Sequence, residues 1–503
     1  MTFVSHYDIE DFYAKINLVK KTTKQFFARR YRLIIGYIGL LIAFFCVLIF
    51  LPKVAPGGLS SAEMQSAIKS SNIGTDFIQQ GNIIDLPYHL LQKLSLNLFG
   101  LNLISIKLPS IIIGVFTALL IVLLINRWFK SDVAIFGSVL AVLSAAFLFL
   151  ATSGTPTIMY IFWLSLLLWL GSKIVGNKNV SPILVVSFFL AVSASLYTPH
   201  LIYVAITIAI AGLLHPHLRF ALKQIKPIQV ILSFAIFVII ALPLVVSCIM
   251  QPSVVKDILF ASNFDFGSYF TNISESFAPF FSFGIAYDSV YLSPLFNLAT
   301  IALIFIGILA SMGELFTSRN TVISLLVIFA IVFSGLNKDI AVLVIIPVAI
   351  LSAAGIESIF KKWHSLFPEN PYARFIGTVP MLVVVLLIIL PSFSHFVEGY
   401  HYTPNVAKNF NNDIELINKF DSGSILVVSE TQENRDFYKL FERYNSITVV
   451  DKMPERTPNR IVYLSNICDD ERFTLKQIIT SPKSRNSDRL YIYEKIPTNQ
   501  GEE

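Results

Sequence analysis

Long apolar runs alternate with short polar segments over most of the chain. Crossing a hydrocarbon core of ~30 Å takes about 20 helical residues. Eleven runs approach or exceed this length, at 33–52, 108–126, 133–152, 157–173, 181–197, 198–214, 228–248, 293–311, 321–336, 339–357 and 376–393. The pattern predicts a polytopic α-helical membrane protein with about eleven transmembrane helices. Counts from ten to thirteen fit as well, because several neighbouring runs are joined by only a few residues.

Two polar segments between the runs are longer than a connection needs to be. Residues 53–107 contain amphipathic stretches at 60–71 and 85–99, which predict helices lying at the membrane interface. Residues 249–292 are rich in Phe, Tyr, Ser and Asn. Long loops are frequently functional, so both segments are candidates for the site.

From residue 396 the composition becomes that of a soluble domain. Four short runs predict strands and one segment predicts a helix; the strands are Ile425–Ser429, Ser446–Val450, Arg460–Leu464 and Arg489–Tyr493, and the helix is Gln432–Arg443. This order predicts a small α/β domain with a partly parallel sheet. Gly423 is the only glycine between Tyr400 and Gly501, so no glycine-rich phosphate loop is present, and we interpret this part of the chain as a docking or accessory domain. The predicted parts are 1–32, a basic N-terminus; 33–395, the membrane module; and 396–503, the tail domain.

Composition and charge agree with a lipid environment. Apolar residues make up 55% of the chain and charged residues 14%, against roughly 25% charged in soluble proteins. The net charge of +6 is spread over loops and termini, so it indicates orientation and not a nucleic-acid partner. The positive-inside rule places the N-terminus in the cytoplasm and segments 53–107, 249–292 and 396–503 outside it. We expect a multi-pass protein of a bacterial plasma membrane whose first run is a retained signal anchor.

Glu63 is the first candidate for chemistry, because it is a carboxylate a few residues beyond the first run. It lies in Pro56-Gly57-Gly58-Leu59-Ser60-Ser61-Ala62-Glu63, where Ser60 or Ser61 is suited to cap the next helix. The alternative is that Glu63 only complements the positive end of that helix.

Four further candidates lie in segment 53–107. Asp85, Tyr88 and His89 open its second amphipathic stretch, where capping by Asp85 and an interfacial role for Tyr88 compete with catalysis. Lys107 stands at the outer mouth of the second run. It is either a snorkelling anchor or a cation facing a lipid phosphate.

The remaining candidates lie in later outside segments. Ser153-Gly154-Thr155-Pro156 is a tight turn that either presents backbone N–H groups to an anion or simply caps a helix, and Thr155 is a candidate to line the site. Asp265, Glu275 and Asp288 lie in the second long segment, where their spacing selects none of them to hold a metal or an acceptor. No metal site is assigned, and the three cysteines show no CxxC pairing. The apolar runs contain almost no charge, which disfavours an ion-coupled transporter.

Residues 33–175 resemble the N-terminal module of the GT-C membrane glycosyltransferases, in particular the protein O-mannosyltransferase and aminoarabinose-transferase group. Four elements of the first outside segment carry this resemblance in order: Pro56-Gly57-Gly58-Leu59-Ser60-Ser61-Ala62-Glu63, Leu86-Pro87-Tyr88-His89-Leu90-Leu91, Phe99-Gly100-Leu101 and Ile106-Lys107-Leu108-Pro109-Ser110. The chain departs from the group where Ala62 replaces the Asp of an Asp-Glu pair and where Lys107 replaces an Arg.

The resemblance implies an inverting glycosyltransferase that takes a sugar from a polyprenyl-phosphate carrier to a glycan, lipid or protein acceptor at the extracytoplasmic face. It implies that Glu63 is the base toward the acceptor and that Lys107 stabilises the departing phosphate. The alternative is a lipid or glycan translocase, or a non-catalytic membrane scaffold, with the same fold.

Overall fold

The computed structural model describes residues 38–74, 78, 82–177, 179–260, 266–281, 292–314, 316–367, 369, 372, 376–403, 406, 408–418, 420, 425–428, 435–450, 460–464, 472–480 and 489–496. The predicted N-terminal segment 1–32 lies outside the described residues. The chain divides into two compact units, 1–48 and 49–503, and the described part of the first is the beginning of the apolar helix Ile38–Val54.

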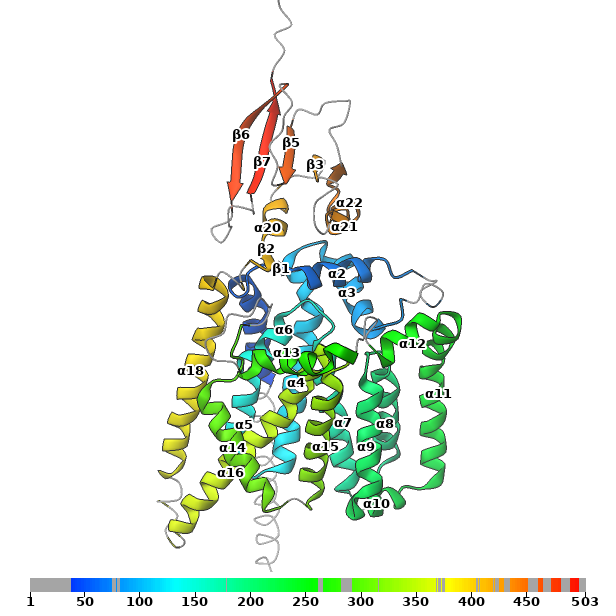
Figure 1. Ribbon diagram of the computed structural model, residues 1–503, viewed down its shortest axis with the longest axis vertical. Coiled ribbons are helices and arrows are strands. Elements are labelled where there is room, and N and C mark those ends of the chain that lie inside the picture. The colour runs from blue at the N-terminus through cyan, green and yellow to red at the C-terminus, as the bar shows by residue number, and fades with distance from the viewer. Residues whose placement is uncertain are drawn as a thin grey trace, which may run out of the picture. The chain divides into compact units, whose positions relative to one another are not determined.

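Helices make up the membrane module of the second unit (Figure 1). They are α2 Ser61–Ser71, α3 Leu86–Phe99, α4 Leu103–Trp128, α5 Ser131–Val142, α6 Ala145–Thr152, α7 Ile158–Val175, α8 Pro182–Ser195, α9 Leu201–Leu214, α10 Pro216–Lys223, α11 Pro227–Met250, α12 Pro252–Leu259, η1 Phe266–Ser268, α13 Tyr269–Phe281, α14 Leu298–Met312, α15 Ser318–Ser334, η2 Lys338–Val344, α16 Ile345–Leu366 and α18 Thr378–Tyr402.

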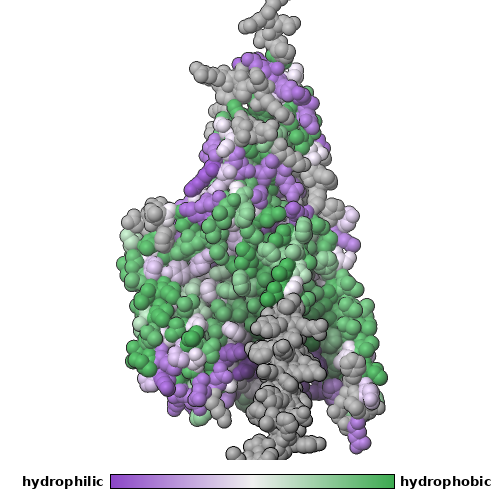
Figure 2. All heavy atoms as spheres, turned by 180° about the vertical axis from the view of Figure 1, so that it is seen from behind, coloured by the Kyte–Doolittle hydropathy of each residue, from purple (hydrophilic) through white to green (hydrophobic). Residues whose placement is uncertain are grey.

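The chain is an integral multi-pass membrane protein. Among the described residues, five helices are long and apolar enough to cross a membrane, or up to seven if each of two bent pairs is one span. Each of the eleven predicted runs coincides with an apolar helix, although four of these helices are shorter than a full span by this criterion. A band of hydrophobic residues covers the helical part of one face, with hydrophilic residues above and below it (Figure 2). The count of eleven spans stays a prediction.

One predicted run is broken into two helices. Residues 133–152 form α5 and α6, which meet at an angle of 55°. The break is at Ser144, whose hydroxyl accepts a hydrogen bond from the backbone N–H of Phe147 at 3.3 Å and so caps α6. A serine side chain that can satisfy a free N–H favours a new helix start over continuation of the old helix.

The two amphipathic stretches of the first outside segment are helices, as predicted. They form α2 and α3, which pack against each other, and α3 also packs against α4. In Figure 1 both lie at the opposite end of the helical module from α10. The candidate residues at positions 60–63 and 85–89 therefore lie at helix N-termini on one side of the membrane module.

The tail domain contains a mixed five-stranded sheet. The described elements of the tail are β2 Phe410–Asn411, α20 Asp413–Ile417, β3 Ile425–Val427, α21 Arg435–Tyr438, α22 Leu440–Asn445, β4 Thr448–Val450, β5 Arg460–Leu464, β6 Phe473–Thr480 and β7 Arg489–Lys495. The strand order is β4-β3-β5-β7-β6, with β3 parallel to β4 and β5 and the other pairs antiparallel. The predicted partly parallel sheet is confirmed.

Strand β6 is absent from the sequence prediction. It is an edge strand with most of its residues exposed, and its register against β7 shifts between Leu475 and Gln477. Both features remove the regular alternation of apolar and polar positions by which a strand is recognised.

The tail and segment 53–107 share one hydrophobic core. Leu59, Met64 and Leu96 belong to the same buried cluster as Phe437 and Phe441 of the tail. In addition, the two-residue strand β1 Leu59–Ser60 pairs antiparallel with β2. Tail residues thus hold the chain immediately before Glu63.

Candidate functional site

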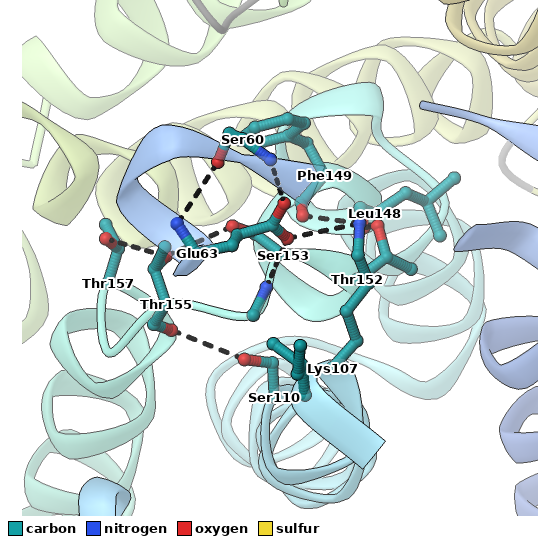
Figure 3. A network of polar contacts seen from close by, with 12 residues as sticks. Ser60, Glu63, Lys107, Ser110, Leu148, Phe149, Thr152, Ser153, Thr155 and Thr157 are labelled. Carbon is teal, nitrogen blue, oxygen red and sulfur yellow. Dashed lines mark hydrogen bonds and ion pairs between the residues drawn. The ribbon is translucent and has the colours of Figure 1, made fainter. Parts of the chain in front are cut away.

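The buried Glu63 carboxylate lies at the centre of a polar network (Figure 3). Its Oε1 is 3.1 Å from Nζ of Lys107, and the two side chains are 1% and 0% exposed. Lys107 is in the second turn of α4, so a membrane helix brings the cation to the carboxylate. The snorkelling interpretation of Lys107 is wrong, because a snorkelling ammonium extends into water and this one is buried in an ion pair.

The other carboxylate oxygen belongs to a capping box. Oε2 accepts a hydrogen bond from the backbone N–H of Ser60 at 2.7 Å, and the Ser60 hydroxyl accepts one from the N–H of Glu63 at 3.3 Å. Ser60, one of the two serines that the sequence suggested as a cap, is the N-cap of α2. Glu63 therefore has a structural role at the helix N-terminus in addition to its pairing with Lys107.

The turn between α6 and α7 supplies a further backbone hydrogen-bond donor to the Glu63 carboxylate. The backbone N–H of Gly154 donates to Oε1 of Glu63 at 2.6 Å. The turn does present an N–H to an anion, and that anion is the Glu63 side chain. A Cβ at position 154 would lie 2.9 Å from Cγ2 of Ile106, so a glycine permits this close approach.

Gln92 links α2, the first turn of α4 and the turn after α6, and it was not among the candidates from the sequence. Its side chain is fully buried. Its Nε2 donates to the carbonyls of Ile106 and Gly154 at 2.9 and 3.1 Å, and its Oε1 accepts from the hydroxyls of Ser66 and Ser70 at 2.8 and 2.6 Å. A signal was present, because Tyr88, His89, Gln92 and Ser95 recur at helical spacing and mark a polar face of α3 that is buried.

Tyr88 and His89 extend this network. The Tyr88 hydroxyl lies 2.8 Å from Oγ of Ser110, which in turn donates to the carbonyl of Thr155 at 3.3 Å. Burial raises the pKa of the Tyr88 hydroxyl, so Tyr88 stays protonated.

His89 is a neutral donor in the same network. Its Nδ1 is 2.8 Å from Oγ of Ser70. Since the Ser70 hydrogen is given to Gln92, the His89 ring carries its proton on Nδ1 and donates to Ser70. Burial lowers the pKa of His89 to about 3.

Asp85 lies apart from the Glu63 cluster. It occupies the N-cap position of α3 in the left-handed conformation, with φ 55°, but its side chain makes no capping hydrogen bond. Side-chain capping by Asp85, one of the alternatives from the sequence, is therefore not what the structure shows. Its backbone N–H donates to the carbonyl of Tyr197 at 2.8 Å. Burial raises the pKa of the Asp85 carboxyl to about 7, which the charge of Lys69 partly offsets.

Thus the structure brings together Glu63, Lys107, Tyr88, His89 and the turn that contains Thr155. Asp265 and Asp288 lie outside the described residues, and Glu275 is a half-exposed partner of Lys338 at 2.5 Å. The described residues contain no group of three or more His, Cys, Asp or Glu side chains arranged to hold a metal ion.

The coordination of Glu63 limits what it can do chemically. An ionised carboxylate has about four acceptor positions. The N–H groups of Ser60 and Gly154 occupy two of them, and the Lys107 ammonium forms an ion pair with Oε1 but no hydrogen bond. Acceptor capacity is therefore left for a proton donor such as a hydroxyl, and the two hydrogen bonds and the ion pair hold the carboxylate in a fixed orientation.

Comparison with known proteins supports the family resemblance found in the sequence. Residues 87–246 match the family model described as dolichyl-phosphate-mannose-protein mannosyltransferase. No curated protein sequence matches the chain.

Two solved structures of ArnT from Cupriavidus metallidurans are similar in fold. The form bound to undecaprenyl phosphate has 12% identity and a TM-score of 0.51 over 93% of this chain and 99% of that one. The apo form has 13% identity and a TM-score of 0.50 over 91% and 98%. The resemblance found in the sequence is confirmed: this chain has an ArnT-like fold and, over residues 87–246, the sequence pattern of the dolichyl-phosphate-mannose-protein mannosyltransferase family.

Proposed function

We propose that this protein is a membrane glycosyltransferase that transfers a sugar from a polyprenyl-phosphate carrier to an acceptor hydroxyl at the extracytoplasmic face. Three findings support the proposal: the family match over residues 87–246, the ArnT-like fold, and the undecaprenyl phosphate bound in the related ArnT structure. The acceptor class is a glycan, a lipid or a protein.

In the proposed reaction, the acceptor oxygen attacks the anomeric carbon of the sugar from the face opposite the phosphate. The new C–O bond forms as the bond to the phosphate oxygen breaks, and that oxygen keeps the electron pair, so the anomeric configuration inverts. Glu63 accepts the hydroxyl proton at a carboxylate acceptor position that the Ser60 and Gly154 N–H groups leave open. General base assistance of this kind contributes roughly 10²–10⁴ in rate. Lys107 stabilises the charge on the released lipid phosphate.

The single observation that supports this mechanism is the set of contacts made by the Glu63 carboxylate. Two backbone hydrogen bonds and the ion pair with Lys107 hold it in place, and acceptor capacity is left for a hydroxyl. Because Glu63 is 1% exposed, the acceptor and donor reach it only after a movement of α2 or of the turn at Gly154. In the same movement, Lys107 exchanges part of its contact with Glu63 for contact with the phosphate.

A specific observation favours a second candidate, a non-catalytic scaffold. The ion pair is closed off from solvent, and two cavities in the described part of the chain are lined by neither Glu63 nor Lys107. In this alternative the pair only joins α2 to α4.

Glu63→Gln distinguishes the enzyme from the scaffold when a second substitution also removes the buried charge of Lys107. Alone, Glu63→Gln leaves the Lys107 ammonium buried without a counter-ion, which costs about 3–5 kcal/mol and affects folding in either case. The double variant Glu63→Gln, Lys107→Met removes both charges at similar volume.

The measurement compares surface and lipid-linked glycans, by mass spectrometry, in cells that lack the gene and carry each variant. The enzyme proposal predicts that the double variant has the wild-type melting temperature in detergent but leaves the glycan unmodified. Wild-type glycan from a well-folded double variant would establish the scaffold instead.

A further inference from the structure

A large cavity lies inside the helical module, well away from Glu63. Its volume is about 850 Å³, within the range of roughly 300–1,000 Å³ typical of small-molecule sites. Its walls come from α7, α8, α9 and α11 and are mostly apolar; they include Leu168, Val185, Phe188, Phe189, Ala205 and Phe237. An apolar cavity of this size between membrane helices suits a hydrocarbon chain better than a polar metabolite.

One end of the cavity is charged. Arg127, in the last turn of α4, and Arg319, in the first turn of α15, both line it, together with Glu314 and Glu357. Arg319 is engaged with both carboxylates, at 3.6 and 3.8 Å, and Lys361 lies within 4 Å of the same two. The three cations and the two carboxylates carry a net charge of +1, so one positive charge at this end of the cavity is not balanced.

Arg127 supplies the cation that is available to a ligand. Its side chain is exposed, and no carboxylate among the described residues lies within ion-pair distance of it. Its guanidinium occupies the space that a Cβ at Gly176 would need, so the glycine lets it rest against the end of α7 at the mouth of the cavity. An arginine fixed in this way matches the geometry of a phosphate group.

The cavity and the Glu63 network are at opposite ends of the same helices. Lys107 is near the beginning of α4 and Arg127 near its end. Twenty residues at a helical rise of ~1.5 Å separate them by about 30 Å, the thickness of a hydrocarbon core. A lipid phosphate at Arg127 is therefore out of reach of Glu63, and under the predicted orientation it lies in the cytoplasmic leaflet.

We propose that this cavity is a binding site for one glycerophospholipid of net negative charge from the cytoplasmic leaflet. An acyl chain fills the apolar part between α7, α8, α9 and α11, and the phosphate binds Arg127. Basic pockets between transmembrane helices on the cytoplasmic side are suited to such headgroups. The site is separate from the proposed glycosyl transfer and does not depend on it.

Gly171→Phe and Arg127→Gln test the two parts of the site separately. A Cβ at Gly171 would meet only Phe188, at 3.9 Å, so the larger side chain enters the cavity without straining α7. The matched controls are Gly39→Phe, which replaces a glycine whose Cβ has no atom within 4 Å, and Arg219→Gln, which replaces an exposed arginine that does not line the cavity.

The measurement is native mass spectrometry of the full-length detergent-solubilised protein with added phosphatidylglycerol, phosphatidylethanolamine or undecaprenyl phosphate. We expect one phosphatidylglycerol to be retained by the wild type and both controls. Its occupancy falls about tenfold in Arg127→Gln, through loss of a charged hydrogen bond, and is abolished in Gly171→Phe. Melting temperatures equal to that of the wild type show that the variants are folded.

Two results would overturn the proposal. Equal retention of phosphatidylglycerol by the wild type and by a folded Gly171→Phe would mean that the lipid binds elsewhere on the surface. Preferential retention of undecaprenyl phosphate, lost in both cavity variants, would make the cavity a site for the carrier lipid and not for a phospholipid.

Discussion

Gly154 allows the turn after α6 to approach Glu63 closely. A methyl group at this position would lie 2.9 Å from Cγ2 of Ile106 and 3.4 Å from Oε1 of Glu63. We expect Gly154→Ala to lower stability by about 1–3 kcal/mol, as overpacking in a closed interior does. Thermal unfolding in detergent measures the change. Gly171→Ala is the control, because its methyl group has only one ordinary contact, and an equal effect of both would show that position 154 is not tightly packed.

Asp85 makes stability depend on pH in a direction that can be measured. Burial raises its pKa from 3.8 to about 7, so the folded state binds more protons than the unfolded state between these values. Its ionisation costs no stability below pH ~4, and the cost grows as pH rises to about 7 and is complete above that. Asp85→Asn removes the cost. We therefore expect the variant to melt at a higher temperature than the wild type at pH 8, with a much smaller difference at pH 4.5.

The control for Asp85→Asn is Asp132→Asn, at an exposed carboxylate in the first turn of α5. Its melting temperature is measured at the same pH values as that of Asp85→Asn. A difference between wild type and Asp85→Asn that stays constant from pH 4.5 to pH 8 would show that Asp85 is ionised in the folded protein throughout.

At the scale of elements, α14 and α16 are packed through a pair of glycines. A Cβ at Gly307 would overlap the carbonyl oxygen of Leu351, and a Cβ at Gly355 would overlap that of Leu303. Small residues that let two backbones meet are characteristic of membrane helix pairs, in which lipid provides no hydrophobic force to join them. The two helices therefore approach more closely than any side chain would allow.

Gly307→Ala and Gly355→Ala should each separate these helices. Because the overlapping atoms are backbone, they cannot rotate away, and we expect each variant to lose at least about 1–3 kcal/mol of stability. Size-exclusion chromatography after a heating series in detergent gives the fraction that remains folded. Gly313→Ala, at the end of α14 with one contact at 3.6 Å, should behave as the wild type does. Wild-type behaviour of Gly355→Ala would contradict the close packing.

At the scale of the whole molecule, the tail stabilises the candidate site. Phe441 is fully buried in the core that includes Met64 and Leu96, and the Arg443 side chain donates to the carbonyl of Ser71 at 2.8 Å. The tail domain is therefore part of the support for α2 and α3. In physical terms, the predicted accessory role means that the tail packs against α2 and α3, the helices that carry Glu63 and Gln92.

Phe441→Ala tests this coupling. Truncation of a buried phenylalanine costs about 3–5 kcal/mol, and because the core is shared, we expect faster hydrogen exchange in 61–71 and 86–99 as well as in the tail. Hydrogen-exchange mass spectrometry of the full chain measures all three. The exposed Leu475→Ala in β6 is the control. Faster exchange confined to the tail would mean that the first outside segment is stable without it.

Much of the architecture was predictable because it follows from local patterns. Each apolar run coincides with a helix, and α2 and α3 begin where the amphipathic stretches begin. The edge strand β6 was missed because exposure and a register shift erase its alternation. Glu63 and Lys107 were both identified as candidates, whereas Gln92 was not, because its partners are 14 to 62 residues away along the chain.

The sequence by itself determined which segments lie in lipid and which lie in water. A run of apolar side chains is stable in lipid as a helix and in almost no other form. It also placed the start of α2 at Ser60 or Ser61, of which Ser60 is the N-cap. Only the tertiary structure decided that Lys107 pairs with Glu63, that Gly154 completes the coordination of the carboxylate, and that Asp85 stands apart. The reason is physical: hydropathy and capping act over a few residues, whereas an ion pair depends on which helices meet, and that is set by the packing of the whole core.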